Sequence, residues 1–298
     1  MRQTALISLL WSKNLNVLHY YLNNRPRLVL AMAQACTPEL RALVEGAGSQ
    51  LMALDSLVSS ERRAEIHAEV AARLARFNAL QTEALWQDFC DQFGLLPSEL
   101  NEALNPNLAA SLSDAMILVE ALDRAAEQLH VELALVNEDL MRVGRIVCAW
   151  ARARGVPSLH LAHGLALATP YTVHAALHAD RLAVFGERGG EGYRDIGIDP
   201  ARLAVTGNPA WDVYSGLKLE KPRVREAVCA KYLLKKDAPL LVFGATWAAF
   251  LNAGSYAAIY EQTLAVFLQA CKALIDAGRP VNIVIKDRPS NVEHGRQS

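Results

Sequence analysis

Short runs of apolar, β-type residues alternate with helix-type segments along most of this chain. The first part is expected to form strand 4–10, helix 14–24, strand 27–33, helix 37–48 and strand 50–57. The helix at 37–48 carries its own boundary signals, because Thr37 suits the N-cap, Pro38 the first helical position, and Gly46 and Gly48 the end. Strands that alternate with helices in this way predict an α/β fold with a parallel, doubly wound sheet.

This alternation is interrupted between residues 59 and 130 by sequence of helical character. The stretch 59–94 begins at a serine and keeps an apolar period of about 3.6 residues up to Gly94, and 112–130 has the pattern of a second amphipathic helix. The segment between them is punctuated by proline and asparagine. We interpret the whole region as a helical insertion on the sheet, whose charges lie on solvated helix faces.

The alternation resumes after residue 130. Strands are expected at 131–139, 156–164, 180–186 and 201–212, with helices at 140–155 and 169–178. A charged segment, 219–237, then leads to strand 238–246, helix 259–278 and strand 280–289. One βαβ unit cannot cover both faces of a parallel sheet. We therefore predict a Rossmann-like domain at 1–218 and an incomplete second Rossmann-type domain at 219–298, and expect a longer parent protein.

Composition excludes several classes of protein. With 52% hydrophobic residues and a formal charge of −1, the 298-residue chain can bury a large core and has no excess of positive charge for nucleic acid. Its five cysteines are scattered without a CxxC pair, as in a reduced, cytoplasmic protein. No run approaches the roughly 20 apolar residues of a membrane span, and the first residues do not resemble a signal peptide. Peripheral membrane contact is left open.

Candidate site residues follow from the position of the strand ends. Ligands of open α/β sheets bind at the carboxyl ends of the strands, beside helix N-termini. That rule selects polar or glycine-containing stretches along one rim of the sheet: 137–139, 163–164, 186–188, 207–209, 244–247 and 286–289.

Within these stretches, Glu138 and Asp139 are the candidates for acid–base catalysis, because a partly desolvated carboxylate at a strand end suits a general base or a nucleophile. Alternatively, Asn137 or Asp139 caps the helix that follows. His163 is either a group presented to a cleft or a strand-end histidine bonded to a nearby carbonyl. Gly164, directly after it, would let a ligand approach the backbone closely.

The histidine pairs do not indicate a metal site. His174 and His178 have helical spacing but lack the glutamate of the zinc-protease motif, and His160 and His163 point to opposite faces of a strand. We expect neither a metal nor a cofactor.

Two further stretches have features that suit phosphate groups. The glycine-rich run 185–193 departs from the GxGxxG fingerprint, has no long helix expected directly after it, and is equally explained by a loop with several positive φ angles. Lys286 and Arg288 end the last strand with two cations that suit a phosphate or diphosphate, with a solvated strand end as the alternative.

The order of these features resembles a known family. After His163-Gly164, the run "ADRLAVFGERGGEGYRDIGIDPARLAVTGNPAWD", which ends at Asp212, is similar to GT-B glycosyltransferases of bacterial capsule and surface-polysaccharide synthesis. These include capsule Kdo transferases, CDP-glycerol glycerophosphotransferases and polysialyltransferases. The resemblance covers roughly residues 131–289. Sugar-nucleotide 2-epimerases share the fold and part of the closing "VTGNP" motif.

The resemblance implies a GT-B-like fold and transfer of a sugar from a CMP-, UDP- or CDP-linked donor to a bacterial surface glycan or lipid-linked acceptor, at the inner face of the membrane. It places Glu138 or Asp139 as the catalytic carboxylate and His163 as a group that orients the acceptor or stabilises the leaving phosphate. The residues assigned to the nucleotide sugar are Gly164, Gly207, Asn208, Thr246, Trp247, Lys286 and Arg288.

One position departs from the family. Arg288 stands where the family keeps a histidine in its Lys-x-His-Pro motif, which leaves the donor unspecified. The alternatives are a sugar-nucleotide 2-epimerase or hydrolase of the same fold and a non-catalytic, truncated binding module. A homodimer is left open.

Overall fold

A computed structural model of the chain describes residues 3–11, 14–79, 83–162, 164, 168–208, 211–244 and 254–286. The chain divides into two compact units, Met1–Asp212 and Val213–Ser298. The boundary that we placed after residue 218 falls inside the first helix of the second unit.

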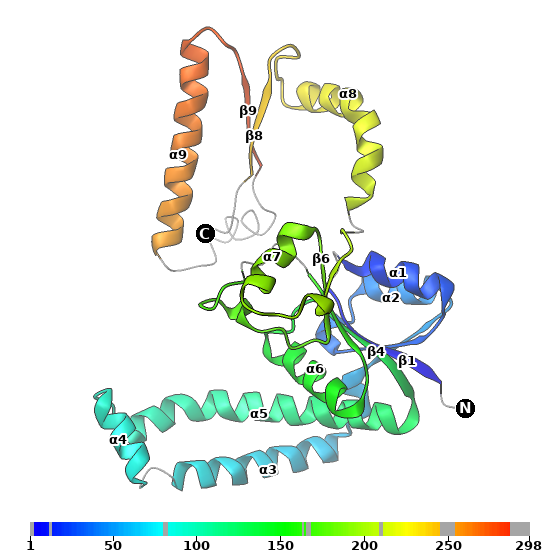
Figure 1. Cartoon of the computed structure of the whole chain (residues 1–298), viewed down its shortest axis with the longest axis vertical. Coiled ribbons are helices and arrows are strands. Elements are labelled where there is room, and N and C mark those ends of the chain that lie inside the picture. Colours follow the sequence, from blue (N-terminus) through cyan, green and yellow to red (C-terminus); the bar gives the residue numbers. More distant parts are fainter. Residues whose placement is uncertain are drawn as a thin grey trace. The chain divides into compact units, whose positions relative to one another are not determined.

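The first unit is built on a parallel sheet of seven strands, shown in Figure 1. They are β1 (Thr4–Leu9), β2 (Leu28–Ala31), β3 (Gln50–Ala53), β4 (His130–Val136), β5 (Ser158–Leu161), β6 (Arg181–Val184) and β7 (Leu203–Val205). Their order is β3-β2-β1-β4-β5-β6-β7, so the direction of progress through the sheet reverses between β1 and β4. The predicted α/β class with a Rossmann-type parallel sheet is confirmed.

Both faces of this sheet are covered by helices. The helices of the unit are α1 (Leu15–Asn24), α2 (Pro38–Gly46), α3 (Ser60–Ala79), α4 (Ala84–Gln92), α5 (Pro97–Gln128), α6 (Arg142–Arg154) and α7 (Glu187–Asp195). Because side chains alternate along a strand, Leu6 belongs to the core on the side of α1 and α2, while Ala5 and Ile7 belong to the core that includes residues of α5, α6 and α7. Burial on both faces explains why the strands are continuous apolar runs.

The helical insertion is an arm formed by α3, α4 and α5, which extends away from the sheet (Figure 1). The single helix expected at 59–94 is two helices, and α5 is continuous from Pro97, although proline and asparagine predicted a break before residue 112. Pro106 lies inside α5 and cannot bond the carbonyl of Glu102. Both residues are exposed, so water can take the place of the missing donor.

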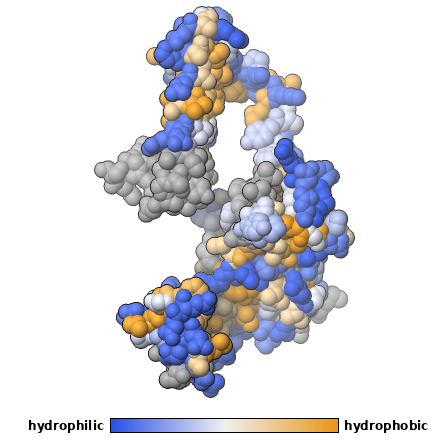
Figure 2. Space-filling model, turned by 60° about the vertical axis from the view of Figure 1, so that its left-hand side comes forward, coloured by the Kyte–Doolittle hydropathy of each residue, from blue (hydrophilic) through white to orange (hydrophobic). Residues whose placement is uncertain are grey.

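Apolar side chains lie on the surface at the outer end of this arm. Leu85, Phe89 and Phe93 follow each other at four-residue spacing and are all exposed. Trp86 stacks on Phe89, with 5.8 Å between the ring centroids. Figure 2 shows this end of the arm, at the lower left, with hydrophobic patches among hydrophilic surface. In the part of the chain that the structure describes, no helix is long and apolar enough to cross a membrane.

The glycine-rich run after β6 forms helix α7, so the alternative explanation of its glycines, a loop with several positive φ angles, does not hold. Close packing explains one of its glycines, because a Cβ on Gly192 would lie 2.8 Å from the carbonyl oxygen of Ala168. The helix expected at 169–178 is reduced to one 3₁₀ turn, η5 (Val173–Ala175). The strand expected at 50–57 ends at Ala53 and continues as a 3₁₀ turn, η3 (Leu54–Leu57).

The second unit contains α8 (Val213–Lys231), β8 (Leu240–Gly244), α9 (Gly254–Asp276) and β9 (Asn282–Lys286). β8 and β9 pair in parallel on either side of α9 in the sequence, which confirms the predicted βαβ unit. The buried side chain of Asn282 accepts from the N–H of Lys235 at 3.0 Å and donates to its carbonyl oxygen at 2.6 Å. The chain thus has the expected element order, a Rossmann-type parallel sheet followed by a βαβ unit.

Candidate functional site

The point where the strand order reverses is held together by one buried asparagine. Asn137 directly follows β4, and the backbone N–H of Trp11, after β1, donates to its Oδ1 at 2.6 Å. Its Nδ2 donates to the carbonyl oxygen of Leu161, the last residue of β5, at 2.8 Å. Asn14 adds a 3.4 Å bond to the carbonyl oxygen of Ala162. The loops that follow β1, β4 and β5 are therefore joined at the crevice where open α/β sheets bind ligands.

The predicted carboxylates next to Asn137 occupy different environments. Asp139 is 1% exposed, and its Oδ2 accepts from the N–H groups of His178 at 2.7 Å and Ala179 at 2.8 Å. Its Oδ1 lies 3.0 Å from Nδ1 of His160. Burial raises the pKa of Asp139, but His160 and the two N–H groups outweigh it and hold the pKa below its usual range. Because both oxygens are engaged, this arrangement favours a positioning role for Asp139 over the acid–base role.

Glu138 is only partly buried and is fixed by its neighbours. Its Oε1 accepts from the N–H of Leu140 at 3.2 Å. Gly144, in the first turn of α6, lies so close that a Cβ there would be 1.7 Å from the carbonyl oxygen of Glu138. Only glycine allows this contact, which holds the Glu138 backbone against the N-terminal turn of α6. Neither Asn137 nor Asp139 caps α6, because the N-cap residue is Met141, with no side-chain cap.

Two other ionisable groups near these carboxylates remain neutral. Burial and the negative charge of Asp139 raise the pKa of the Cys148 thiol and of the Tyr193 hydroxyl to about 12 each. Neither group is activated as a nucleophile near neutral pH. Glu138 therefore remains the acid–base candidate that we carry forward.

The other predicted site residues are spread over both units. Gly164 follows β5, and Gly207 and Asn208 follow β7, all at the same edge of the seven-stranded sheet. Gly207 has a φ of 74°, which favours glycine. Lys286 is exposed at the end of β9 in the second unit. His163, Thr246, Trp247 and Arg288 lie outside the described residues, so their roles remain predictions.

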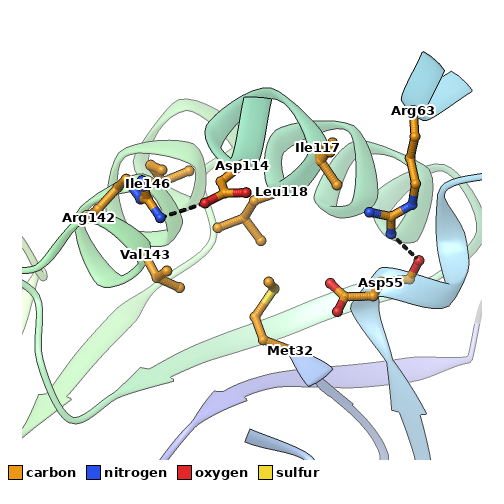
Figure 3. Close-up of a pocket in the computed structure, with 9 residues that line it drawn as sticks. All are labelled: Met32, Asp55, Arg63, Asp114, Ile117, Leu118, Arg142, Val143 and Ile146. Atoms are coloured by element: carbon orange, nitrogen blue, oxygen red, sulfur yellow. Dashed lines mark hydrogen bonds and ion pairs between the residues drawn. The ribbon is translucent and has the colours of Figure 1, made fainter. Parts of the chain in front are cut away.

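A pocket of about 220 Å³ lies at the carboxyl end of the same sheet, on the side covered by α5 and α6 (Figure 3). Met32 and Asp55 enter it from just beyond β2 and β3, and Arg142 and Val143 from the start of α6. The full lining is Met32, Asp55, Arg63, Asp114, Ile117, Leu118, Arg142, Val143 and Ile146. The pocket thus combines an apolar wall with two carboxylates and two guanidinium groups.

The two arginines of the pocket make short hydrogen bonds to neighbouring residues. Arg142 donates from Nη2 to Asp114 Oδ2 at 2.6 Å and from Nη1 to Ser111 Oγ at 2.8 Å. Arg63 donates from Nη2 to the backbone oxygen of Asp55 at 2.7 Å and so fixes the η3 turn. Figure 3 shows the Asp55 carboxylate extending from that turn toward the pocket.

Sequence reasoning did not select these pocket residues. The strand-end rule misses Met32 and Asp55 because the strands expected at 27–33 and 50–57 contain them. In the structure β2 ends at Ala31 and β3 at Ala53, so Met32 follows a strand and Asp55 lies in the η3 turn. No local signal marks Arg63 or Asp114, because they come from the arm and reach the pocket only through tertiary packing.

The donor sets of the described residues offer no metal centre. Among residues 3–11, 14–79, 83–162, 164, 168–208, 211–244 and 254–286, no group of three or more His, Cys, Asp or Glu is placed to hold a metal ion. The cysteines are free thiols, four of them buried.

No protein-family model matches this sequence, and no curated protein matches it. Among solved structures, the chain is similar to a UDP-GlcNAc 2-epimerase from Neisseria meningitidis bound to UDP-GlcNAc, with 11% identity and a TM-score of 0.46 over 96% of this chain. It is also similar to a Listeria monocytogenes protein assigned as a UDP-N-acetylglucosamine 2-epimerase, with 15% identity and a TM-score of 0.39, covering 97% of this chain and 70% of that one. The chain spans 65% of the length of the Neisseria protein. Similarity this low does not indicate what the chain binds or catalyses.

Proposed function

We propose that this chain is an enzyme that acts on a sugar nucleotide at the carboxyl edge of its seven-stranded sheet. The observation that carries the proposal is the arrangement at the strand reversal, where Asn137 joins three loops and Glu138 stands partly exposed beside the start of α6. A carboxylate there can move a proton, and a nearby helix N-terminus favours phosphate oxygens. The resemblance in the run that ends at Asp212 supports a sugar nucleotide as the substrate.

Two classes of reaction fit this arrangement. In glycosyl transfer, Glu138 takes the proton of an acceptor hydroxyl, the hydroxyl oxygen bonds to the anomeric carbon, and the nucleotide leaves with its phosphate. A bacterial surface glycan is the acceptor class that the resemblance suggests. The second class needs no acceptor. In hydrolysis, water takes the place of the acceptor hydroxyl; in epimerisation, a proton leaves one face of a ring carbon and a proton returns to the opposite face. Lys286 is proposed as a phosphate contact.

The first experiment incubates the protein with UDP-GlcNAc, the ligand named for the Neisseria structure, and with CMP-, CDP- and GDP-linked sugars. Thermal melting reports binding, and NMR of the recovered sugars in D₂O separates the reactions. Deuterium at a ring carbon identifies epimerisation, free sugar identifies hydrolysis, and a new glycosidic product with added glycan identifies transfer. If no sugar nucleotide raises the melting temperature or is turned over, the proposal is wrong.

The second experiment tests Glu138. Because general acid–base catalysis contributes about 10²- to 10⁴-fold, Glu138→Gln should lower turnover by that factor while the melting temperature stays unchanged. Glu191→Gln, on the exposed side of α7, is the matched control and should keep full turnover. Full turnover in Glu138→Gln would remove this residue from the mechanism.

A further inference from the structure

The size of the pocket limits what it can hold. Its volume of about 220 Å³ lies below the roughly 300–1,000 Å³ of pockets for drug-sized molecules. A single six-membered ring with its substituents is of a suitable size, whereas a nucleotide or a chain of several rings is too large.

The charges of the pocket balance. Its two guanidinium groups, Arg63 and Arg142, are matched by two carboxylates, Asp55 and Asp114. A site for an anion or a cation needs an excess of the opposite sign, because burying an unpaired charge is costly. The balance favours a ligand without net charge.

The hydrogen-bonding groups are suited to hydroxyls. The Asp55 carboxylate makes no hydrogen bond or ion pair with the described residues and can only accept, so it requires a donor such as O–H. Arg142 uses two of its five N–H donors on Ser111 and Asp114, which leaves others for hydroxyl oxygens. Donors and acceptors thus face the same small space (Figure 3).

The remaining wall is apolar. Met32, Leu118 and Val143 line the pocket together with two isoleucines. A sugar ring has a C–H face that can pack on such side chains and a rim of hydroxyls that can reach charged groups. From size, charge balance, spare hydrogen-bonding groups and this wall, we infer that the pocket binds a neutral, polyhydroxylated ring of monosaccharide size. The further assignment of this ring as the acceptor end of a transfer reaction rests on the proposed function. Binding of the ring to the pocket does not rest on it, because binding is measured without a sugar-nucleotide donor.

The test follows the methyl group of Met32 by NMR in protein labelled on its five methionine methyls, with Met32→Leu giving the assignment. Neutral hexoses and N-acetylhexosamines are titrated against glucuronic acid and glucosamine, which carry one negative and one positive charge. We expect the Met32 signal to shift with neutral sugars and to need at least tenfold more of either charged sugar. A shift only with a charged sugar, or with none, would overturn the inference.

Two variants and a control locate the binding. Asp55→Asn removes the negative charge and replaces one of the two acceptor oxygens with an NH₂ donor, and Val143→Phe fills the pocket from a half-buried position; each should weaken sugar binding at least tenfold. Asp88→Asn, exposed on α4, should bind like the wild type. Circular dichroism and thermal melting check that each variant is folded. If Asp55→Asn does not fold, sugar binding by Val143→Phe decides whether the pocket is the binding site. Wild-type affinity in Val143→Phe would place the sugar elsewhere and overturn the inference.

The outcome separates the two proposals. Turnover of a sugar nucleotide without any effect of neutral sugars on Met32 would refute the pocket and leave the proposed enzyme intact. Sugar binding that Val143→Phe abolishes, in a protein that turns over no sugar nucleotide, would support the pocket and refute the enzyme.

Discussion

The turn between β4 and α6 and the 220 Å³ pocket lie at the same edge of one sheet, but their polar side chains differ in burial and in how many of their hydrogen bonds are made within the protein. In the turn, Asn137 and Asp139 are buried, and their side chains form hydrogen bonds with backbone groups of other loops. In the pocket, Asp55 and Arg142 are partly exposed or exposed and keep unused hydrogen-bonding capacity beside an apolar wall. Buried, satisfied groups fix the shape of a loop, whereas groups with spare capacity bind ligands.

The largest effect expected from this contrast is on stability. Asp139→Ala leaves the N–H groups of His178 and Ala179 and the buried ring of His160 without this carboxylate, and should lower the free energy of unfolding by about 3–5 kcal/mol, as for a broken buried pair. Urea denaturation measures the loss. Asp114→Ala, at the exposed rim of the pocket, should cost no more than about 1 kcal/mol. Equal losses in the two variants would contradict the contrast.

The same carboxylate should give the turn a dependence on pH. The pKa of Asp139 is lower in the folded chain than the usual aspartate value of about 3.9, so the unfolded state binds the proton first. Its contribution to stability is complete above that value and is lost as the pH falls through the folded pKa. We expect the free energy of unfolding to decline on acidification below about pH 4, with a shallower decline in Asp139→Asn. Identical acid profiles would show that Asp139 is not the titrating group.

A smaller effect is expected where α6 touches the turn. Gly144→Ala would force its Cβ against the carbonyl oxygen of Glu138, and overpacking of this kind costs about 1–3 kcal/mol. The displaced Glu138 should also lower turnover. Gly46→Ala, in α2 with open space around it, should leave both properties unchanged or raise stability slightly. A neutral Gly144→Ala would mean that this contact does not hold the turn.

The smallest stability effect belongs to the pocket rim. Arg142→Gln breaks an exposed ion pair with Asp114 and should change the free energy of unfolding by only about 0.2–1 kcal/mol. The same variant should weaken binding of neutral sugars, measured at the Met32 methyl. A loss of stability comparable to that of Asp139→Ala would show that Arg142 holds α5 to α6 and does not serve mainly as a binding group.

Much of the sheet was predictable, because strands that are buried on both faces leave short continuous apolar runs, such as 4–10 and 27–33, between helix-type segments. Two helices were not. α5 passes through Pro106, and α7 forms on a glycine-rich run, because packing against the rest of the unit outweighs the poor helix propensity of these residues.

The candidate site was predictable to the level of the sheet edge. The strand-end rule found Glu138 and Asp139, but the sequence does not say which is buried, because the groups that engage Asp139 follow some 20 to 40 residues later in the chain. The pocket was missed because residues distant in the chain complete it: Arg63 and Asp114 lie on helices of the arm, which a rule based on strand ends does not select.

The position of the arm in the chain also has a kinetic consequence. Thr4 of β1 pairs with His130 of β4, so this central pair of the sheet forms only after β2, β3 and the whole arm have been closed into one loop. Such long-range pairing is slow, whereas α3, α4 and α5 can form locally and early. The entropy of closure grows slowly with loop length, by about 0.6 kcal/mol for each doubling. Lengthening or shortening the outer part of the arm should therefore change how fast the sheet assembles more than how stable it is.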